Sequence, residues 1–355
     1  MSSISSPKQP TEQSVVCSTA VVLVAQARLA VTQAVVAVVL LALLDKREYG
    51  IFTAAIAWID PFRALSIFGL DTIGLRRAAA QPEDLPKILG TLMSTRLLTG
   101  ALSFCAAALI SLTVRSSAES GGLIGAVAAL AILSSSVLLP IQVAYQARHQ
   151  VKRIAWAPAV GGLVQLGVIA LLFWFDAPLV YFVAVTALAD AVSSAIILRL
   201  IRKELGYVPW GTDRKLAKSM LLEALPVGYM QLVIMLYKRL GYYLLEAFKG
   251  MTAVAALGAA TQIASPVNAV AGALAISVNP YAASLSAGQR YEELGAFFRV
   301  LLRKSILVLL PISTVTALLA EPVARALDPQ YLDAAAAYRW LTFAVIWMFM
   351  CQVST

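Results

Sequence analysis

The stretch ALPVGYMQLVIMLYKRLGYYLLEAFKG, residues 224–250, contains two adjacent cations inside an apolar run that is long enough to cross a membrane. Lys238 and Arg239 stand near the middle of this run. A charge at that depth costs about 2.5 kcal/mol or more, and such charges usually face a protein interior or a water-filled cavity. The stretch therefore indicates a membrane helix that borders a polar interior.

The composition of the whole chain supports this interpretation. Of its 355 residues, 60% are hydrophobic and 13% are charged, whereas a soluble protein has about 45–50% apolar and 25% charged residues. The apolar runs last twenty residues or more, while the strands of a membrane barrel alternate over about ten residues. We therefore predict an all-α integral membrane protein.

Ten apolar segments are long enough to cross a bilayer as helices. They are residues 15–44, 51–72, 90–113, 121–146, 155–175, 178–200, 219–246, 252–284, 297–320 and 334–355. Lys and Arg concentrate in alternate connections, and the positive-inside rule then places the tail of residues 1–14 in the cytoplasm. The net charge of +9 is explained by this orientation and by anionic lipid headgroups, so we predict no nucleic-acid partner.

A basic linker, residues 201–218, divides the chain into residues 15–200 with six spans and residues 219–355 with four. A weak repeat crosses this linker. LLDKREYGIFTAAIAWID (43–60) and LLEAFKGMTAVAALGAATQI (244–263) each end one span in a short charged turn and begin a span rich in small residues. Parallel repeats of this kind are common in transporters, whose substrate site lies between the repeats.

Four stretches carry a resemblance to a known family: LLDKREYGIFTAAIA (43–57), LSIFGLDTIGLRRAAA (65–80), residues 224–250 and EPVARALDPQYLDAAAAYRWL (321–341). On these stretches the chain resembles the polysaccharide (O-antigen, Wzx-type) flippases of the MATE-like multidrug/oligosaccharidyl-lipid/polysaccharide exporter superfamily. The resemblance implies two MATE-like helical lobes, usually of six spans each. Because this sequence stops at its tenth span, we expect the second lobe to be incomplete, as a fragment or with a partner completing it. Lys238 also departs from the family, which commonly has an acidic residue at that place.

Charged residues within the predicted spans define the candidate site. Arg28 either pairs with an acidic residue or faces the central cavity. Asp60 and Arg63 lie one helical turn apart, so they either pair with each other or Asp60 pairs with Arg28. We expect Pro61, between them, to disturb the helix. Asp190 serves in structural pairing or in ion coupling.

Residues adjacent on a helix point about 100° apart, so at most one of Lys238 and Arg239 aims straight into a single cavity. The resemblance favours Arg239, whose planar fork suits phosphate oxygens. Glu223, at the start of the same span, is expected to extend to the membrane interface.

The four candidate cations Arg28, Arg63, Lys238 and Arg239 outnumber Asp60 and Asp190. A cavity that they share would be cationic and would suit an anionic cargo such as a lipid diphosphate that carries sugars. Several amide side chains could bind the sugars: Gln33, Gln142, Gln165, Gln231, Gln262 and Asn268. Each of these alone is more often a contact between helices.

The leading functional hypothesis is a flippase for lipid-linked oligosaccharides that works by alternating access in the bacterial inner membrane. Membrane lipids and other polysaccharide-assembly proteins are its expected partners. One alternative is an ion-coupled multidrug exporter of the same superfamily, although residues 13–44 lack the acidic residue that this group tends to use. A polysaccharide polymerase or an acyltransferase is a weaker alternative, because the predicted outer loops are short.

The chain offers no motif for catalysis or for a cofactor. His149 is the only histidine, it falls in a predicted cytoplasmic loop, and the three cysteines lack metal-ligand spacing. No GxxxxGK[ST] motif for ATP is present. We therefore predict a protein that is not an enzyme and that has no cofactor and no metal site.

Overall fold

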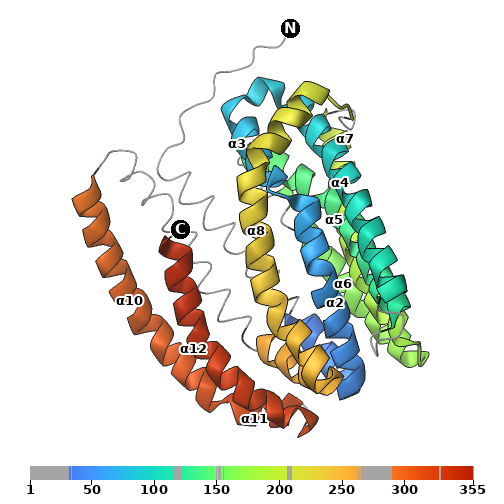
Figure 1. Cartoon of the computed structure of the whole chain (residues 1–355), viewed down its shortest axis with the longest axis vertical. Helices are drawn as coiled ribbons and strands as arrows, with labels where there is room; N and C mark the ends of the chain where they lie inside the picture. The colour runs from blue at the N-terminus through green and yellow to red at the C-terminus, as the bar shows by residue number, and fades with distance from the viewer. Residues whose placement is uncertain are drawn as a thin grey trace.

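The computed structural model describes residues 32, 34–114, 121–148, 150, 153–154, 156–205, 210–262, 264, 290–327 and 329–354. Across these residues the protein is helical, without a β-strand, which confirms the predicted all-α class (Figure 1). The helices are α2 (Lys46–Ile67), α3 (Leu70–Ala80), α4 (Leu85–Val114), α5 (Gly122–Ala147), α6 (Ala157–Trp174), α7 (Leu179–Leu205), α8 (Arg214–Lys249), α10 (Tyr291–Leu318), α11 (Ala320–Leu327) and α12 (Leu332–Ser354). Helical turns also occupy Ala34–Leu43 and residues 251–262.

Seven of the described helical segments are long and apolar enough to cross a membrane. The predicted spans 90–113, 121–146 and 155–175 correspond to α4, α5 and α6, with ends that agree within a few residues. Most of the predicted spans 15–44 and 252–284 lies outside the described residues. A multi-span membrane protein is confirmed, while the division of the chain into two lobes stays a prediction.

The second predicted span is a broken helix. Lys46–Ala80 is apolar enough to be one span, but Phe68 and Gly69 have φ angles of 40° and 73° and separate α2 from α3. A bulky residue such as Phe rarely takes a positive φ. The helix α8 holds the break in place, because a Cβ atom on Gly228 would lie 2.7 Å from the Phe68 carbonyl oxygen.

The helix does not break at Pro61, where the sequence predicted a disturbance. Proline lacks the N–H that would bond to the carbonyl four residues earlier, which here belongs to Ala57. The hydroxyl of Tyr243, from α8, donates a hydrogen bond to that carbonyl oxygen at 2.9 Å. A side chain from a neighbouring helix therefore satisfies the carbonyl, and α2 continues to Ile67.

The two turns of the sequence repeat contact each other in space. A Cβ atom on Gly50, in α2, would overlap the carbonyl oxygen of Met251, and one on Gly258 would lie 2.8 Å from the Thr53 side chain. Small residues one helical turn or two apart allow backbones to approach this closely in membrane proteins. We call this contact between α2 and residues 251–262 the seam.

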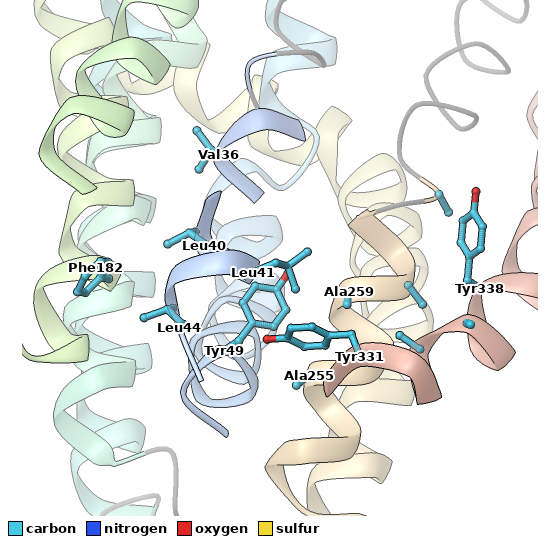
Figure 2. Close-up of a cluster of buried hydrophobic side chains, with 14 of the residues drawn as sticks. Val36, Leu40, Leu41, Leu44, Tyr49, Phe182, Ala255, Ala259, Tyr331 and Tyr338 are labelled. Atoms are coloured by element: carbon cyan, nitrogen blue, oxygen red, sulfur yellow. The ribbon is translucent and has the colours of Figure 1, made fainter. Parts of the chain in front are cut away.

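Aromatic residues cover the end of the seam. The rings of Tyr49 and Tyr331 meet edge to face with their centroids 5.9 Å apart. Leu41, Ala255 and Ala259 pack into the same buried cluster (Figure 2). This cluster joins α2, residues 251–262 and the segment between α11 and α12, at the end of the bundle opposite to α3 (Figure 1).

Helices α3 and α7 finish, and α4 and α8 begin, at the same end of the bundle (Figure 1), and the sequence near these helix ends is rich in basic residues. We call this end of the bundle the basic end, and its members include Arg76, Arg77, Lys87, Arg202, Lys203, Arg214 and Lys215. The predicted extension of Glu223 to the membrane interface stays a prediction. Glu223 forms ion pairs with both Arg76 and Arg77, and so ties α8 to α3.

Candidate functional site

A cavity of about 420 Å³ lies among α2, α5, α6, α7 and the Ala34–Leu43 turns. Its wall combines apolar side chains with polar ones that can both donate and accept hydrogen bonds. The polar members of the wall are Tyr49, Arg63, Gln142, Gln165, Thr186, Asp190, Ser193 and Gln262. Three of the six amide side chains that the sequence suggested for sugar binding are therefore in one cavity.

Arg63, from α2, and Asp190, from α7, lie close together in the wall of this cavity. Their closest nitrogen and oxygen atoms are 3.9 Å apart, and the two side chains are 31% and 37% exposed. That distance is too long for a hydrogen bond, so the two charges attract each other without a fixed geometry. Either group can turn to a ligand at low cost.

Asp60 and Arg239 form a second ion pair, which links α2 to α8. The Asp60 side chain is 6% exposed and the Arg239 side chain is 29% exposed. The guanidinium of Arg239 also lies 5.4 Å from the centre of the Tyr242 ring, close enough for a cation–π interaction. Neither member of the pair lines the 420 Å³ cavity.

These positions correct the pairing that helical spacing predicted. Asp60 and Arg63 lie one turn apart but each has a partner on a different helix, Arg239 and Asp190. The alternative partner of Asp60, Arg28, falls outside the described residues. One cation and one carboxylate, and not an excess of cations, line the described cavity.

The adjacent residues Lys238 and Arg239 point in different directions, in accordance with the 100° step of a helix. Arg239 turns toward α2, whereas the Lys238 side chain is exposed. His149 and the candidate amides Gln33 and Asn268 lie outside the described residues.

A buried polar network that the sequence did not predict lies next to the break between α2 and α3. Arg96, which has no exposed surface, lies 3.2 Å from the Asp71 carboxylate. It donates a hydrogen bond to the Ser66 hydroxyl at 3.0 Å, which in turn lies 3.1 Å from the Ser136 hydroxyl. In the sequence, Arg96 is the one charged residue of the predicted span 90–113. The network connects α2, α3, α4 and α5, so its evident effect is to fix their packing.

Ion pairs also fix the basic end. Lys87, in α4, lies 2.9 Å from the Asp213 carboxylate, which accepts hydrogen bonds from the backbone N–H groups of Lys215 and Leu216 and so caps α8. The hydrogen bond from the Lys87 ammonium lowers the pKa of Asp213, and the bond from the N–H of Leu216 lowers it further. Asp213 therefore stays ionised at neutral pH.

The described residues contain no group of three or more His, Cys, Asp or Glu side chains that could hold a metal ion. The charged and hydrogen-bonding side chains of the cavity wall suit binding and release of a polar solute.

Comparison with known proteins identifies the fold. A family model described as polysaccharide biosynthesis protein matches residues 15–286. The MatE family model matches residues 226–355. Among curated proteins, none matches the chain.

Solved structures of transporters share the architecture. An outward-facing multidrug resistance MATE family transporter of the MOP superfamily aligns with a TM-score of 0.67 and 15% identity, over 95% of this chain and 81% of that one. The eukaryotic MATE transporter AtDTX14 aligns with a TM-score of 0.63 and 11% identity, over 95% of this chain and 81% of that one. A MOP superfamily transporter from Pyrococcus furiosus is described as having a binding pocket of reverse polarity. It aligns with a TM-score of 0.59 and 13% identity, over 95% of this chain and 83% of that one. The MATE-like helical fold is thereby confirmed.

Proposed function

Because the chain belongs to the family of polysaccharide biosynthesis proteins and is a membrane transporter of the MOP superfamily, we propose that it carries a lipid-linked oligosaccharide across the membrane. The cargo is a polyprenyl diphosphate that bears a sugar repeat unit, for use in cell-surface polysaccharide. The membrane is the bacterial inner membrane, and the basic end faces the cytoplasm according to the positive-inside rule.

The composition of the cavity wall carries this proposal. Sugar hydroxyls both donate and accept hydrogen bonds, and the amides of Gln142, Gln165 and Gln262 do the same. A volume of about 420 Å³ falls within the roughly 300–1,000 Å³ that binding sites for small molecules occupy. The polar head of the cargo is held in this cavity while its lipid tail stays in the bilayer.

Arg63 is the first contact for the diphosphate in this proposal. It lines the cavity, is partly exposed and has only a loose partner at 3.9 Å, so a phosphate can replace Asp190 beside its guanidinium. Arg239 is less available, because its release would leave the buried Asp60 carboxylate unpaired. Arg239, with Arg28 and Lys238, joins the binding surface when α2 and α8 move apart.

Transport requires the two ends of the cavity to open in turn. In the described conformation the seam holds α2 against residues 251–262, through Gly50 with Met251 and Thr53 with Gly258. Glu223 bridges α8 to α3 at the basic end. Alternating access then consists of separating these two contact regions one at a time, with Asp60 and Asp190 serving as charge partners.

The test is flipping of a fluorescent polyprenyl diphosphate oligosaccharide in vesicles that contain the purified protein. The readout is the fraction of label that a membrane-impermeant quencher reaches over time. Arg63→Ala is expected to slow flipping about tenfold or more, the equivalent of about 1.4 kcal/mol. Arg63→Lys keeps the charge but loses the fork, so its rate falls between those of the wild type and Arg63→Ala.

Arg325→Ala is the matched control, because Arg325 is an exposed arginine of α11 that pairs with Glu321 and does not line the cavity. Its flipping rate is expected to equal that of the wild type. If Arg63→Ala folds and flips the cargo at the wild-type rate, the proposed diphosphate contact is wrong. If the wild-type protein moves no lipid-linked oligosaccharide, the proposed function is wrong.

Export of cationic drugs is the second candidate function. The observation in its favour is Asp190, a partly exposed carboxylate in the cavity wall that could attract a cation. Uptake of ethidium into the same vesicles under an imposed pH or sodium gradient tests it. An ethidium flux that Asp190→Asn abolishes, together with absent glycan flipping, would favour the exporter over the flippase.

A further inference from the structure

A groove of about 510 Å³ lies at the basic end, apart from the cavity already described. One wall is the first part of α4, with Pro86, Lys87, Gly90 and Thr91. The other wall is residues 210–213, the segment that leads into α8, with Trp210, Gly211, Thr212 and Asp213. The groove shares no lining residue with the 420 Å³ cavity.

Polar contacts at successive turns of α4 hold the two walls together. Lys87 forms the ion pair with Asp213 at 2.9 Å, and the Thr91 hydroxyl accepts a hydrogen bond from the Asp213 backbone N–H at 3.4 Å. Ser94 donates one to the Gly211 carbonyl at 3.3 Å. Lys87, Thr91 and Ser94 lie on one stripe of the helix. The segment before α8 is therefore fixed along α4 and forms a defined wall.

Trp210 stands in this fixed wall with 55% of its surface exposed. A large aromatic side chain that stands next to a fixed backbone and is left open offers a flat apolar surface at low entropic cost. The C–H faces of sugar rings pack on such surfaces.

The charges of the groove are balanced. Lys87 and Asp213 are the charged members of its lining, and they pair with each other. An anionic headgroup would gain no net attraction there, whereas a ligand rich in hydroxyls can hydrogen-bond to the carboxylate, to the ammonium and to the exposed Thr212 at once. The carboxylate is ionised at neutral pH, because the hydrogen bond from Lys87 lowers the pKa of Asp213.

We propose that the groove between α4 and residues 210–213 binds the oligosaccharide part of the cargo at the membrane surface, before the cargo reaches the transport cavity. This inference rests on the proposed function and adds a second sugar site to it. Trp210 supplies the stacking surface, while Asp213 and Lys87 bind the hydroxyl rim of one sugar. The positive-inside orientation places the groove on the side where the cargo would be loaded.

The experiment separates docking from transport. The lipid-free oligosaccharide released by mild acid from the polyprenyl diphosphate pool of the producing cell is the probe, and saturation-transfer NMR measures its binding to the full-length purified protein. Trp210→Ala is expected to weaken probe binding about fivefold to tenfold and to raise the KM of flipping by a similar factor, with maximal rate unchanged within about twofold. Trp210→Phe keeps an aromatic face and restores most of the binding.

Trp156→Ala is the matched control, because Trp156 is also exposed, at 46%, but precedes α6 and does not line the groove. If Trp210 only anchors the protein in the lipid interface, the two alanine variants will behave alike, and the inference is overturned. Asp213→Asn is a second variant that folds, because Asn also caps helices well. It is expected to weaken probe binding, and wild-type binding in both Trp210→Ala and Asp213→Asn would overturn the inference.

The two proposals fail in different ways. Normal flipping with an unchanged KM in Trp210→Ala would refute the groove and leave the flippase standing. Absent flipping by the wild type, with probe binding that Trp210→Ala still weakens, would refute the flippase and retain a glycan site. Absent probe binding by the wild type would refute the groove in either case.

Discussion

The hydroxyl of Tyr243 donates a hydrogen bond at 2.9 Å to the carbonyl of Ala57, the group that Pro61 leaves without its helical partner. One residue of α8 thus completes the backbone of α2. In a lipid environment this hydrogen bond matters, because no water is present to satisfy the Ala57 carbonyl.

Tyr243→Phe is expected to destabilise the protein by about 1 kcal/mol, because it removes the hydroxyl and leaves the Ala57 carbonyl unsatisfied. In a Pro61→Ala background the helix regains its own N–H donor, so Tyr243→Phe should then cost little. Thermal unfolding of the four proteins in detergent gives the coupling energy. Tyr237→Phe, at a tyrosine that is 79% exposed, should be neutral. An equal cost of Tyr243→Phe in both backgrounds would contradict the assigned role.

Arg239→Ala is expected to destabilise the protein strongly, by about 3 kcal/mol. The reason is that the substitution leaves the Asp60 carboxylate, which is 6% exposed, without its partner. The double variant Asp60→Asn/Arg239→Gln removes both charges and should recover most of the loss. Lys238→Ala, at the exposed neighbour of Arg239, should change the midpoint of thermal unfolding little. A loss in the double variant as large as in Arg239→Ala would refute the pair.

Gly50→Ala is expected to disrupt the seam, because the added Cβ would overlap the backbone carbonyl of Met251. Backbone must move to relieve that overlap, and we expect a loss of about 2 kcal/mol or more. Gly241→Ala is the control, since its Cβ would meet a Leu257 methyl at an ordinary 3.6 Å. That change should be neutral or slightly stabilising, because alanine favours helix over glycine. Equal thermal stability of the two variants would show that the seam does not need glycine.

The ion pair between Lys87 and Asp213 at the basic end predicts that the stability of the folded protein depends on pH. The pKa of Asp213 is lowered in the folded protein by the hydrogen bond from Lys87. A depressed carboxyl pKa gives stability that is complete above the unfolded pKa and is lost as the pH falls through the folded pKa, here below about pH 4. Asp213→Asn keeps the helix cap but cannot titrate, so its midpoint of thermal unfolding should fall less than that of the wild type between pH 7 and pH 3. Parallel pH curves for the two proteins would contradict this.

The positions of the membrane helices could be predicted from the sequence because they depend on local composition. The run at 90–113 became α4, Leu85–Val114, and the run at 178–200 became α7, Leu179–Leu205. A stretch of apolar residues must satisfy its backbone internally once it is in lipid, and a helix does so without help from other segments. The extra turns at the helix ends carry charged and polar residues, which hydropathy alone assigns to loops.

The sequence predicted the charged residues of the candidate site but not how they pair. The sequence identified Asp60, Arg63, Asp190 and Arg239 as charges within spans, and each of them takes part in an ion pair. It did not identify the partners. Several pairings are compatible with the same residue spacings, and the choice among them depends on how α2, α7 and α8 are rotated and packed.

Composition and charge pattern by themselves determined that this chain is an all-helical membrane protein, because they report on the solvent that each segment prefers. Only the tertiary structure decided that α2 runs through Pro61 and breaks at Phe68, that the two repeat turns meet at Gly50 and Met251, and that Asp60 binds Arg239 instead of Arg63. Each of these outcomes depends on a group from a distant helix. A hydroxyl, a backbone carbonyl or a guanidinium brought in by packing changes which local conformation has the lowest free energy.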